Sequence, residues 1–152
     1  MIKVLAVGKI KEKALKELIA EYEKRLSRFN KITIVELEDQ PDNKGADYAI
    51  EKESGLLLKH IKDEDFVILL DLKGDSVDSL GFAALLETWQ NNNRELCFVI
   101  GGSNGVNQAV VKRANYNLKL GDLTFPHQIA RLLILEQIYR AYKINNKQNY
   151  HK

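Results

Sequence analysis

The C-terminal part of the chain holds the residues whose types and spacing are best suited to chemistry. Pro126 and His127 open a long apolar segment, Arg131 follows one helical turn later, and the chain ends on the run Tyr150–Lys152. A terminal tail is ordinarily expendable, yet this one carries an aromatic ring, an imidazole and an ammonium group in succession. Of these groups, imidazole alone titrates near neutral pH. We therefore predict that the tail is placed over a ligand.

Arg131 has an unusual position on this segment. At 100° per residue it lies within about 40° of Leu135, Ile138 and Tyr142. It thus falls on a mainly apolar face and close to a helix N-terminus, where the helix dipole disfavours a cation. Such an arginine has either a structural carboxylate partner or an anionic ligand, and both alternatives stay open. For the same electrostatic reason, His127 in the first turn is expected to be neutral or merely hydrogen-bonded.

Charge is distributed unevenly along the chain. Residues 112–152 hold eight lysines and arginines against two acidic residues, a net charge of +6, whereas the whole chain has +2, which leaves −4 for residues 1–111. Such asymmetry is typical of proteins that meet a polyanion. A solvated helix face followed by a polar tail explains the charge equally well.

Three glycine-containing loops are further candidates for a site. The run Gly101–Gly105 lies between a predicted strand and a predicted helix, where bare backbone N–H groups can approach a ligand. The loops Asp71–Asp75 and Gly121–Phe125 also follow predicted strands. Ligands of parallel α/β sheets bind outside the carboxyl ends of the strands, so three such loops favour a pocket at that edge. Asp71 by itself is equally typical of a capped turn.

Several kinds of site and protein are excluded. The glycines follow the fourth predicted strand instead of the first, and no Gly-Lys-Ser/Thr sequence follows, which argues against a dinucleotide fingerprint and excludes a P-loop. The single Cys97 excludes an intramolecular disulfide framework and a multi-cysteine zinc site, and we expect no metal. The N-terminal apolar stretch is too short for a signal peptide and no run is long enough to span a membrane, so we expect a cytoplasmic protein without a membrane partner.

The elements that position these residues follow from hydrophobic periodicity. Short apolar runs alternate with longer helical segments, which predicts an α/β fold with a mostly parallel sheet covered on both faces. We found no linker or repeat and expect one domain over residues 1–152. The predicted strands are Ile2–Val7, Ile32–Leu37, Phe66–Leu70, Leu96–Ile100 and Tyr116–Leu120. The predicted helices are Glu12–Leu26, Ala46–Ile61, Asp78–Gln90, Val106–Ala114 and Gln128–Ile144.

The last predicted helix, Gln128–Ile144, is apolar over most of its circumference. A helix of this kind is buried nearly all round, which is easiest in a small domain if it packs against both its own sheet and a second subunit. We therefore predict a homodimer. Glu136, Arg140 and Lys143 share the remaining face, with a favourable Glu136–Arg140 spacing, and this face is either solvated surface or the edge of an RNA-facing patch.

Five segments of the chain resemble the RlmH-type members of the SPOUT methyltransferase family. They are Val4–Lys9, Phe98–Gly105, Leu123–His127, Glu136–Ala141 and Tyr150–Lys152. The resemblance spans essentially the whole chain. It implies a single-domain α/β fold with a mostly parallel five- or six-stranded sheet, helices on both faces and a C-terminal trefoil knot, in a protein that forms homodimers.

The resemblance also implies an activity and a set of site residues. The activity is transfer of a methyl group from S-adenosylmethionine to N3 of a pseudouridine in a stem-loop of 23S ribosomal RNA of the large subunit, within the assembled ribosome. The implied cofactor contacts are Leu70, Gly101, Gly102, Leu120, Gly121, Asp122, Leu123, Thr124 and Phe125. The implied RNA-binding residues are His127, Arg131, Arg140 and Lys152, and the candidate catalytic residues are His151, Tyr150 and Arg131.

The tail and one loop depart from the pattern of that family. Serines are common where this chain has Lys119 and Gly121, and the family tail usually has glycine and proline where this chain has Lys147 and Asn149. Without those two residues we expect the tail to be more mobile when no RNA is bound. The resemblance further suggests that the tail reaches the cofactor of the partner subunit, with His151 as the candidate general base.

Two other classes of function stay open. A non-catalytic ribosome-binding factor would use the basic C-terminal third but would not need the glycine loops. A small nucleotide-binding α/β enzyme would need the glycine loops but not the basic tail. Binding of S-adenosylmethionine distinguishes a methyltransferase from the first class, and the methylation state of ribosomal RNA distinguishes it from the second.

Overall fold

The computed structural model describes residues 1–152 and contains one five-stranded sheet. The strand order is β2-β1-β4-β3-β5, and every pairing is parallel. The predicted parallel α/β sheet is therefore confirmed, with five strands and not six. The strands are β1 (Ile2–Val7), β2 (Ile32–Leu37), β3 (Phe66–Ser76), β4 (Leu96–Ile100) and β5 (Tyr116–Lys119).

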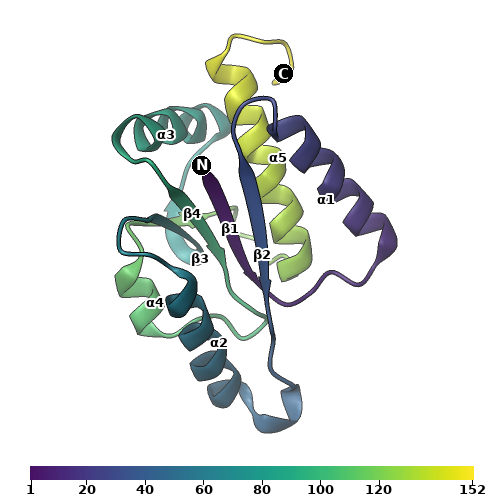
Figure 1. Ribbon diagram of the computed structural model, residues 1–152, viewed down its shortest axis with the longest axis vertical. Coiled ribbons are helices and arrows are strands. Elements are labelled where there is room, and N and C mark those ends of the chain that lie inside the picture. Colours follow the sequence, from purple (N-terminus) through teal and green to yellow (C-terminus); the bar gives the residue numbers. More distant parts are fainter.

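Helices cover both faces of this sheet, as Figure 1 shows. In the inner strand β1, Ile2, Val4 and Ala6 pack toward α1, α3 and α5, whereas Leu5 and Val7 pack toward α2 and α4. This alternation follows from the period of two in a strand and explains why β1 is apolar at every position except Lys3. The helices are α1 (Lys13–Leu26), α2 (Ala46–His60), α3 (Ser79–Asn92), α4 (Gln108–Arg113) and α5 (His127–Asn145), with a short 3-10 turn η1 (Asp42–Lys44).

Capping side chains set where two of the helices begin. The Asp78 carboxylate accepts the N–H of Gly81 at 2.7 Å and begins α3, and the Asn107 side chain accepts the N–H of Val110 at 3.2 Å and begins α4. Each cap satisfies one of the N–H groups that the first helical turn leaves free. The predicted starts at Asp78 and Val106 were therefore early by one and two residues.

Strand β3 is longer than the sequence indicated. Leu70 and Asp75 both pair with Leu118, so the four residues between them form a large bulge, after which the strand resumes and ends at Ser76. The prediction that the strand ends at Leu70 was wrong. Within the bulge, the Asp71 carboxylate accepts the N–H of Lys73 at 2.9 Å, which is the ordinary capped turn.

Helix α5 begins far across the sheet from the strand that precedes it. β5 is an edge strand, whereas His127 at the start of α5 lies against Gly8 at the end of β1, beyond β3 and β4. Residues 120–126 must therefore cross the carboxyl ends of the intervening strands. α5 then runs back between α1 and α3, and the C-terminus lies at the opposite end of the molecule (Figure 1). No helix in the structure has the length and hydrophobicity needed to cross a bilayer.

Candidate active site

The predicted loops Gly101–Gly105 and Gly121–Phe125 lie beyond the carboxyl ends of β4 and β5, and Asp71–Asp75 belongs to the bulge in the second half of β3. A cavity of about 300 Å³ is present beside one of them, lined by Leu118, Lys119 and Leu120 of the β5 end and by Ile134 of α5. This cavity borders the β5–α5 loop but does not include the glycine run Gly101–Gly105. This cavity therefore lies on one side of the predicted end of the sheet.

The predicted cofactor-binding residues differ in how far they are covered. Leu70, Gly101, Gly102, Leu120 and Gly121 are half-buried, and Asp122, Leu123, Thr124 and Phe125 are exposed. Leu123 is 75% exposed and Phe125 is 37% exposed, and Leu72 in the neighbouring bulge is 57% exposed. Apolar side chains gathered beside glycine loops fit a ligand that has a flat or apolar part.

The glycine run is a tight turn with a close neighbour below it. Gly102 and Gly105 form an isolated bridge, in which the N–H of Gly105 donates to the carbonyl of Gly102 at 3.0 Å. A Cβ atom at position 102 would lie 2.6 Å from Oε1 of Glu53. A side chain at this position would therefore collide with α2, which is why glycine is needed here.

Lys119 and Asp122 form an ion pair across the start of the β5–α5 loop. Lys119 Nζ donates to Asp122 Oδ1 at 2.6 Å. The hydrogen bond from Lys119 holds the pKa of the Asp122 carboxyl below its usual value. Because Asp122 is almost fully exposed, the pair adds little stability, but it orients the first residues of the loop.

His127 sits where the end of β1 meets the start of α5. Its Nε2 would be 3.2 Å from a Cβ atom at Gly8, and Gly8 has a φ of +94°, a conformation that favours glycine. Burial lowers the pKa of the His127 imidazole, and the nearby Arg131 lowers it further, against a smaller opposing effect of Asp39. The neutral His127 expected from the sequence agrees with this direction.

Arg131 is inside the protein. Its Nη1 donates to Oε2 of Glu36 at 2.6 Å, its Nη2 donates to the carbonyl of Gly8 at 2.9 Å, and the residue is 1% exposed. The same Glu36 oxygen accepts the N–H of Ile10 at 2.8 Å. Of the two alternatives for Arg131, the structure has the carboxylate partner. Arg131 does not face solvent here, so it holds the ends of β1 and β2 against α5.

The tail lies on the other half of α5. The Tyr150 hydroxyl donates to Glu136 at 3.1 Å, and its ring packs edge-on against Tyr139 with centroids 4.9 Å apart. Arg140 lies 4.9 Å from the centre of the Tyr150 ring and 3.1 Å from Nδ1 of His151. Burial raises the pKa of the Tyr150 hydroxyl, and contacts with Tyr22 and Glu136 raise it further. Lys152 is exposed at the end of the chain.

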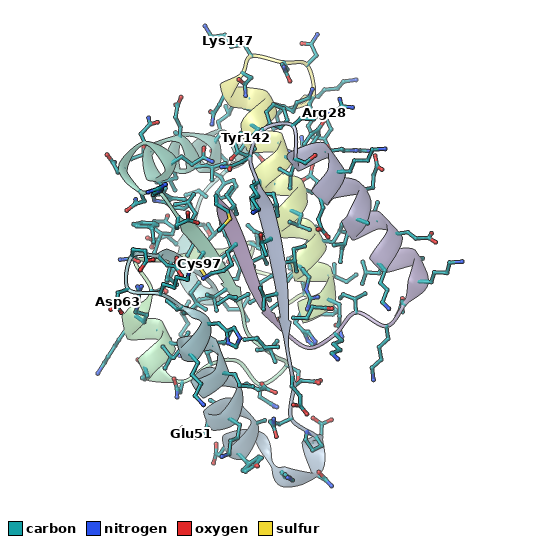
Figure 2. The ribbon with its side chains drawn as sticks, viewed as in Figure 1. Arg28, Glu51, Asp63, Cys97, Tyr142 and Lys147 are labelled. Carbon is teal, nitrogen blue, oxygen red and sulfur yellow. The ribbon has the colours of Figure 1, made fainter.

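The predicted site residues therefore form two groups in one chain. His127 and Arg131 lie at the loop end, whereas Arg140 and the tail lie about 20 Å farther along α5, at 1.5 Å per residue. In Figure 2, Tyr142 and Lys147 lie toward the end of the molecule opposite those loops. The structure does not bring His151 to the glycine loops of its own chain.

Two acidic residues near the loops were not singled out from the sequence. Glu36 is the partner of Arg131, and its only signal was a charge within the apolar strand Ile32–Leu37. Glu53 is buried below Gly102, but it gave no signal because α2 contains several other charged residues. Both are found only when strands and helices are assembled.

Comparison with known proteins supplies the family. Residues 1–151 match the family model described as a predicted SPOUT methyltransferase. The chain is 50% identical to the ribosomal RNA large subunit methyltransferase H of Clostridium botulinum strain Hall, with 99% of each chain covered. It is 46% identical to the protein of the same name from Ruminiclostridium cellulolyticum, again over 99% of each chain. The chain belongs to the SPOUT methyltransferase family.

Membership in the SPOUT family agrees with the arrangement of the chain and implies two further features. The first is the C-terminal trefoil knot. Knots are rare in proteins, and periodicity alone gives no sign of them. The second is the cofactor, because SPOUT methyltransferases use S-adenosylmethionine as the methyl donor.

Proposed function

We propose that this chain methylates N3 of a pseudouridine in a stem-loop of large-subunit ribosomal RNA, on the assembled ribosome in the cytoplasm. The observation that carries the proposal is the meeting of the glycine loops, the exposed apolar residues of the β5–α5 loop and the start of α5 at one end of a SPOUT-family sheet. The names of the relatives support ribosomal RNA of the large subunit as the substrate. We treat residues 1–152 as one catalytic domain.

The residues that would hold S-adenosylmethionine fit such a group. Gly101 and Gly102 offer bare backbone, and the loop Leu120–Phe125 offers backbone groups and exposed apolar side chains. Leu70 lies beside them at the start of the β3 bulge. The bound cofactor supplies an electrophilic methyl group on a sulfonium centre. The protein's main task is then to hold the acceptor nitrogen in line with that methyl group and to exclude water.

We assign the tail of one subunit to the site of its partner. In one chain the tail binds Glu136 and Arg140, far from its own glycine loops. A homodimer in which α5 helices meet would place each tail near the other subunit's loops. The exposed Leu123, Phe125 and Ile129, on the β5–α5 loop and the first turn of α5, are apolar surface that such a contact would cover.

His151 is the group we assign as the proton acceptor. The N3 proton of pseudouridine leaves only at alkaline pH, so a nearby base or a cation that stabilises the anion assists the reaction. His151 is the imidazole of the tail, and histidine is the side chain that most often moves protons in enzymes, while Lys152 and Arg140 supply positive charge for phosphate or for the developing anion. If His151→Gln retains near-normal single-turnover methylation from pH 6 to pH 9, this role is wrong.

Mass mapping of ribosomal RNA tests the function directly. A strain that lacks the gene should lose one methyl group on one pseudouridine of the large-subunit RNA, and the intact gene should restore it. Purified protein should bind S-adenosylmethionine in a calorimeter and methylate ribosomes from the deletion strain. An unchanged methylation state would contradict the proposal, and a protein that binds ribosomes but not the cofactor would instead be a ribosome-binding factor.

A further inference from the structure

Glu53 is a buried carboxylate that the site described above does not use. It lies on α2, is 3% exposed, and its Oε2 accepts the N–H of Gln40 at 2.8 Å. Its other oxygen, Oε1, is buried without any hydrogen-bond partner. Buried polar atoms in proteins are nearly always hydrogen-bonded, because leaving one unpaired is costly. An unpaired carboxylate oxygen in the interior therefore needs a reason.

The unpaired oxygen faces the turn of the glycine loop. A Cβ atom at Gly102 would be 2.6 Å from Oε1 of Glu53 and 3.2 Å from Cγ1 of Val7. Because residue 102 has no side chain, the carboxyl group comes into direct contact with the loop backbone. Gly102 is one of the residues assigned to the cofactor, so Glu53 supports the opposite side of that loop.

The next residue of α2 contacts the other end of the same loop. Ser54 is fully buried, and its Oγ accepts the N–H of Asn107 at 3.0 Å. Asn107 in turn caps α4 through the N–H of Val110. Glu53 and Ser54 thus bracket the turn from residue 102 to residue 107.

We propose that Glu53 is a positioning residue for cofactor binding. Together with Ser54 it holds the loop 101–107 in the shape that receives S-adenosylmethionine, and its bond to Gln40 ties that loop to the segment after β2. The role depends on the shape and hydrogen bonding of the carboxyl group and not on a negative charge. The inference rests on the proposed function, since it assigns the cofactor to this loop.

The surroundings of Glu53 favour a neutral carboxyl group. Burial raises the pKa of Glu53, the N–H of Gln40 opposes this, and the nearby Asp39 and Asp42 raise the pKa further, so that it lies above its usual value. No lysine or arginine is paired with Glu53 in the structure. Glutamine has the shape of a neutral carboxyl group and can accept the same bond from Gln40, so Glu53→Gln should preserve the function.

The test compares Glu53→Ala and Glu53→Gln with a control on the same helix. Glu51→Gln is a suitable control because Glu51, labelled on α2 in Figure 2, is exposed and takes part in none of the ion pairs of the structure. We expect Glu53→Ala to weaken S-adenosylmethionine binding about tenfold by calorimetry, and Glu53→Gln to stay within about threefold of the wild type. The KM for S-adenosylmethionine should rise in Glu53→Ala, while the KM for RNA stays unchanged.

Amide hydrogen exchange gives a readout that needs no cofactor. The Gly105 N–H donates to Gly102 within the turn, and it should exchange faster in Glu53→Ala than in the wild type or in Glu53→Gln. If Glu53→Ala does not fold, Ser54→Ala tests the contact of α2 with the other end of the loop. This change removes only the oxygen that accepts the N–H of Asn107. We expect Ser54→Ala to weaken cofactor binding about threefold.

The results separate this inference from the proposed function. A wild-type protein that does not bind S-adenosylmethionine contradicts the proposed function. A wild-type protein that binds it, with unchanged affinity in Glu53→Ala, overturns only the role of Glu53. Equal losses in Glu53→Ala and Glu53→Gln also overturn that role, since the negative charge would then be what matters. Unchanged affinity for S-adenosylmethionine in Ser54→Ala likewise contradicts the claim that Glu53 and Ser54 together hold the loop 101–107.

Discussion

A buried ion pair fixes the side chains at the end of the sheet where α5 begins. Arg131 joins Glu36 on β2 and the carbonyl of Gly8 on β1, and it also lowers the pKa of His127. A residue that the family resemblance placed on the RNA side is therefore interior in this structure.

Arg131→Ala is predicted to be strongly destabilising. The change leaves the Glu36 carboxylate without its partner, and removing one member of a buried pair typically costs about 3–5 kcal/mol. We expect a loss of about 3 kcal/mol, at the low end of that range, because 36% of the Glu36 side chain is exposed. Chemical denaturation measures this loss. The control is Lys13→Ala, which removes an exposed pair with Glu17 and should leave the free energy of unfolding nearly unchanged. Similar losses in the two variants would contradict the prediction.

Glu36 should also make stability depend on acid pH. Burial raises its pKa, but the hydrogen bonds from Ile10 and Arg131 lower it more, so the pKa lies below its usual value. A carboxyl group whose pKa is lowered by folding stabilises the folded state at any pH above its unfolded-state pKa of about 4.3. This stabilisation is lost as the pH falls through the pKa of the folded state. Unfolding free energy measured from about pH 5 to pH 3 should therefore fall less steeply in Glu36→Gln than in the wild type. Equal slopes would show that Glu36 is not responsible.

At the scale of elements, the junction between β1 and α5 depends on a residue without a side chain. Gly8 ends β1 with a positive φ, and its N–H donates to the carbonyl of Leu37 at 2.7 Å. His127 of α5 packs directly over it. The strand end, the neighbouring strand and the helix start therefore meet at one glycine.

Gly8→Ala is predicted to disturb this junction. A side chain at a φ of +94° is strained by about 1–2 kcal/mol, and its Cβ would also press on the His127 ring. We expect a lower melting temperature and a changed His127 resonance by NMR. Gly55→Ala is the matched control, because Gly55 is helical and has no atom within 4 Å of an added Cβ, so that alanine should stabilise α2 slightly. A Gly8→Ala protein as stable as the wild type would contradict the prediction.

At the scale of the whole molecule, the tail and the loops lie at opposite ends of one chain. This separation is the reason to assign each active site to two subunits, as proposed above. The burial of helix α5 supports a shared active site only in part. Its buried residues form one face packed between α1 and α3, and Ile129 near its start is 39% exposed. The prediction that the helix is buried nearly all round is thus not met within one chain, and the homodimer stays a prediction.

Mixing two inactive variants should restore activity if the sites are shared. One variant lacks residues 148–152, and the other carries Gly102→Val, which blocks the loop against Glu53. In mixed dimers, one of the two sites would combine an intact tail with an intact loop, so mixed dimers purified through both tags should recover about half of wild-type activity. The measurement is methylation by co-expressed subunits isolated through two tags. No recovery, with mixed dimers verified, would mean that the tail acts in its own subunit.

The sequence alone determined a large part of this protein. Periodicity located ten elements, and the bounds of β1, β2 and β4 agree with the structure, because those strands are mainly apolar and flanked by clear turns. It also indicated the carboxyl edge of the sheet as the place for a site. The family followed from its motifs and is shown by the comparisons.

Only the tertiary structure decided which residues of that site touch one another. The continuation of β3 after its bulge depends on pairing with β5, which is distant in sequence. The Arg131–Glu36 pair joins residues 95 positions apart, and Glu53 meets Gly102 only when α2 packs over the ends of β1 and β4. Local sequence sets the preferences of a segment, but burial and the partners of a charge are set by packing between segments. For this reason the roles of Arg131, Glu36 and Glu53 emerged from the fold.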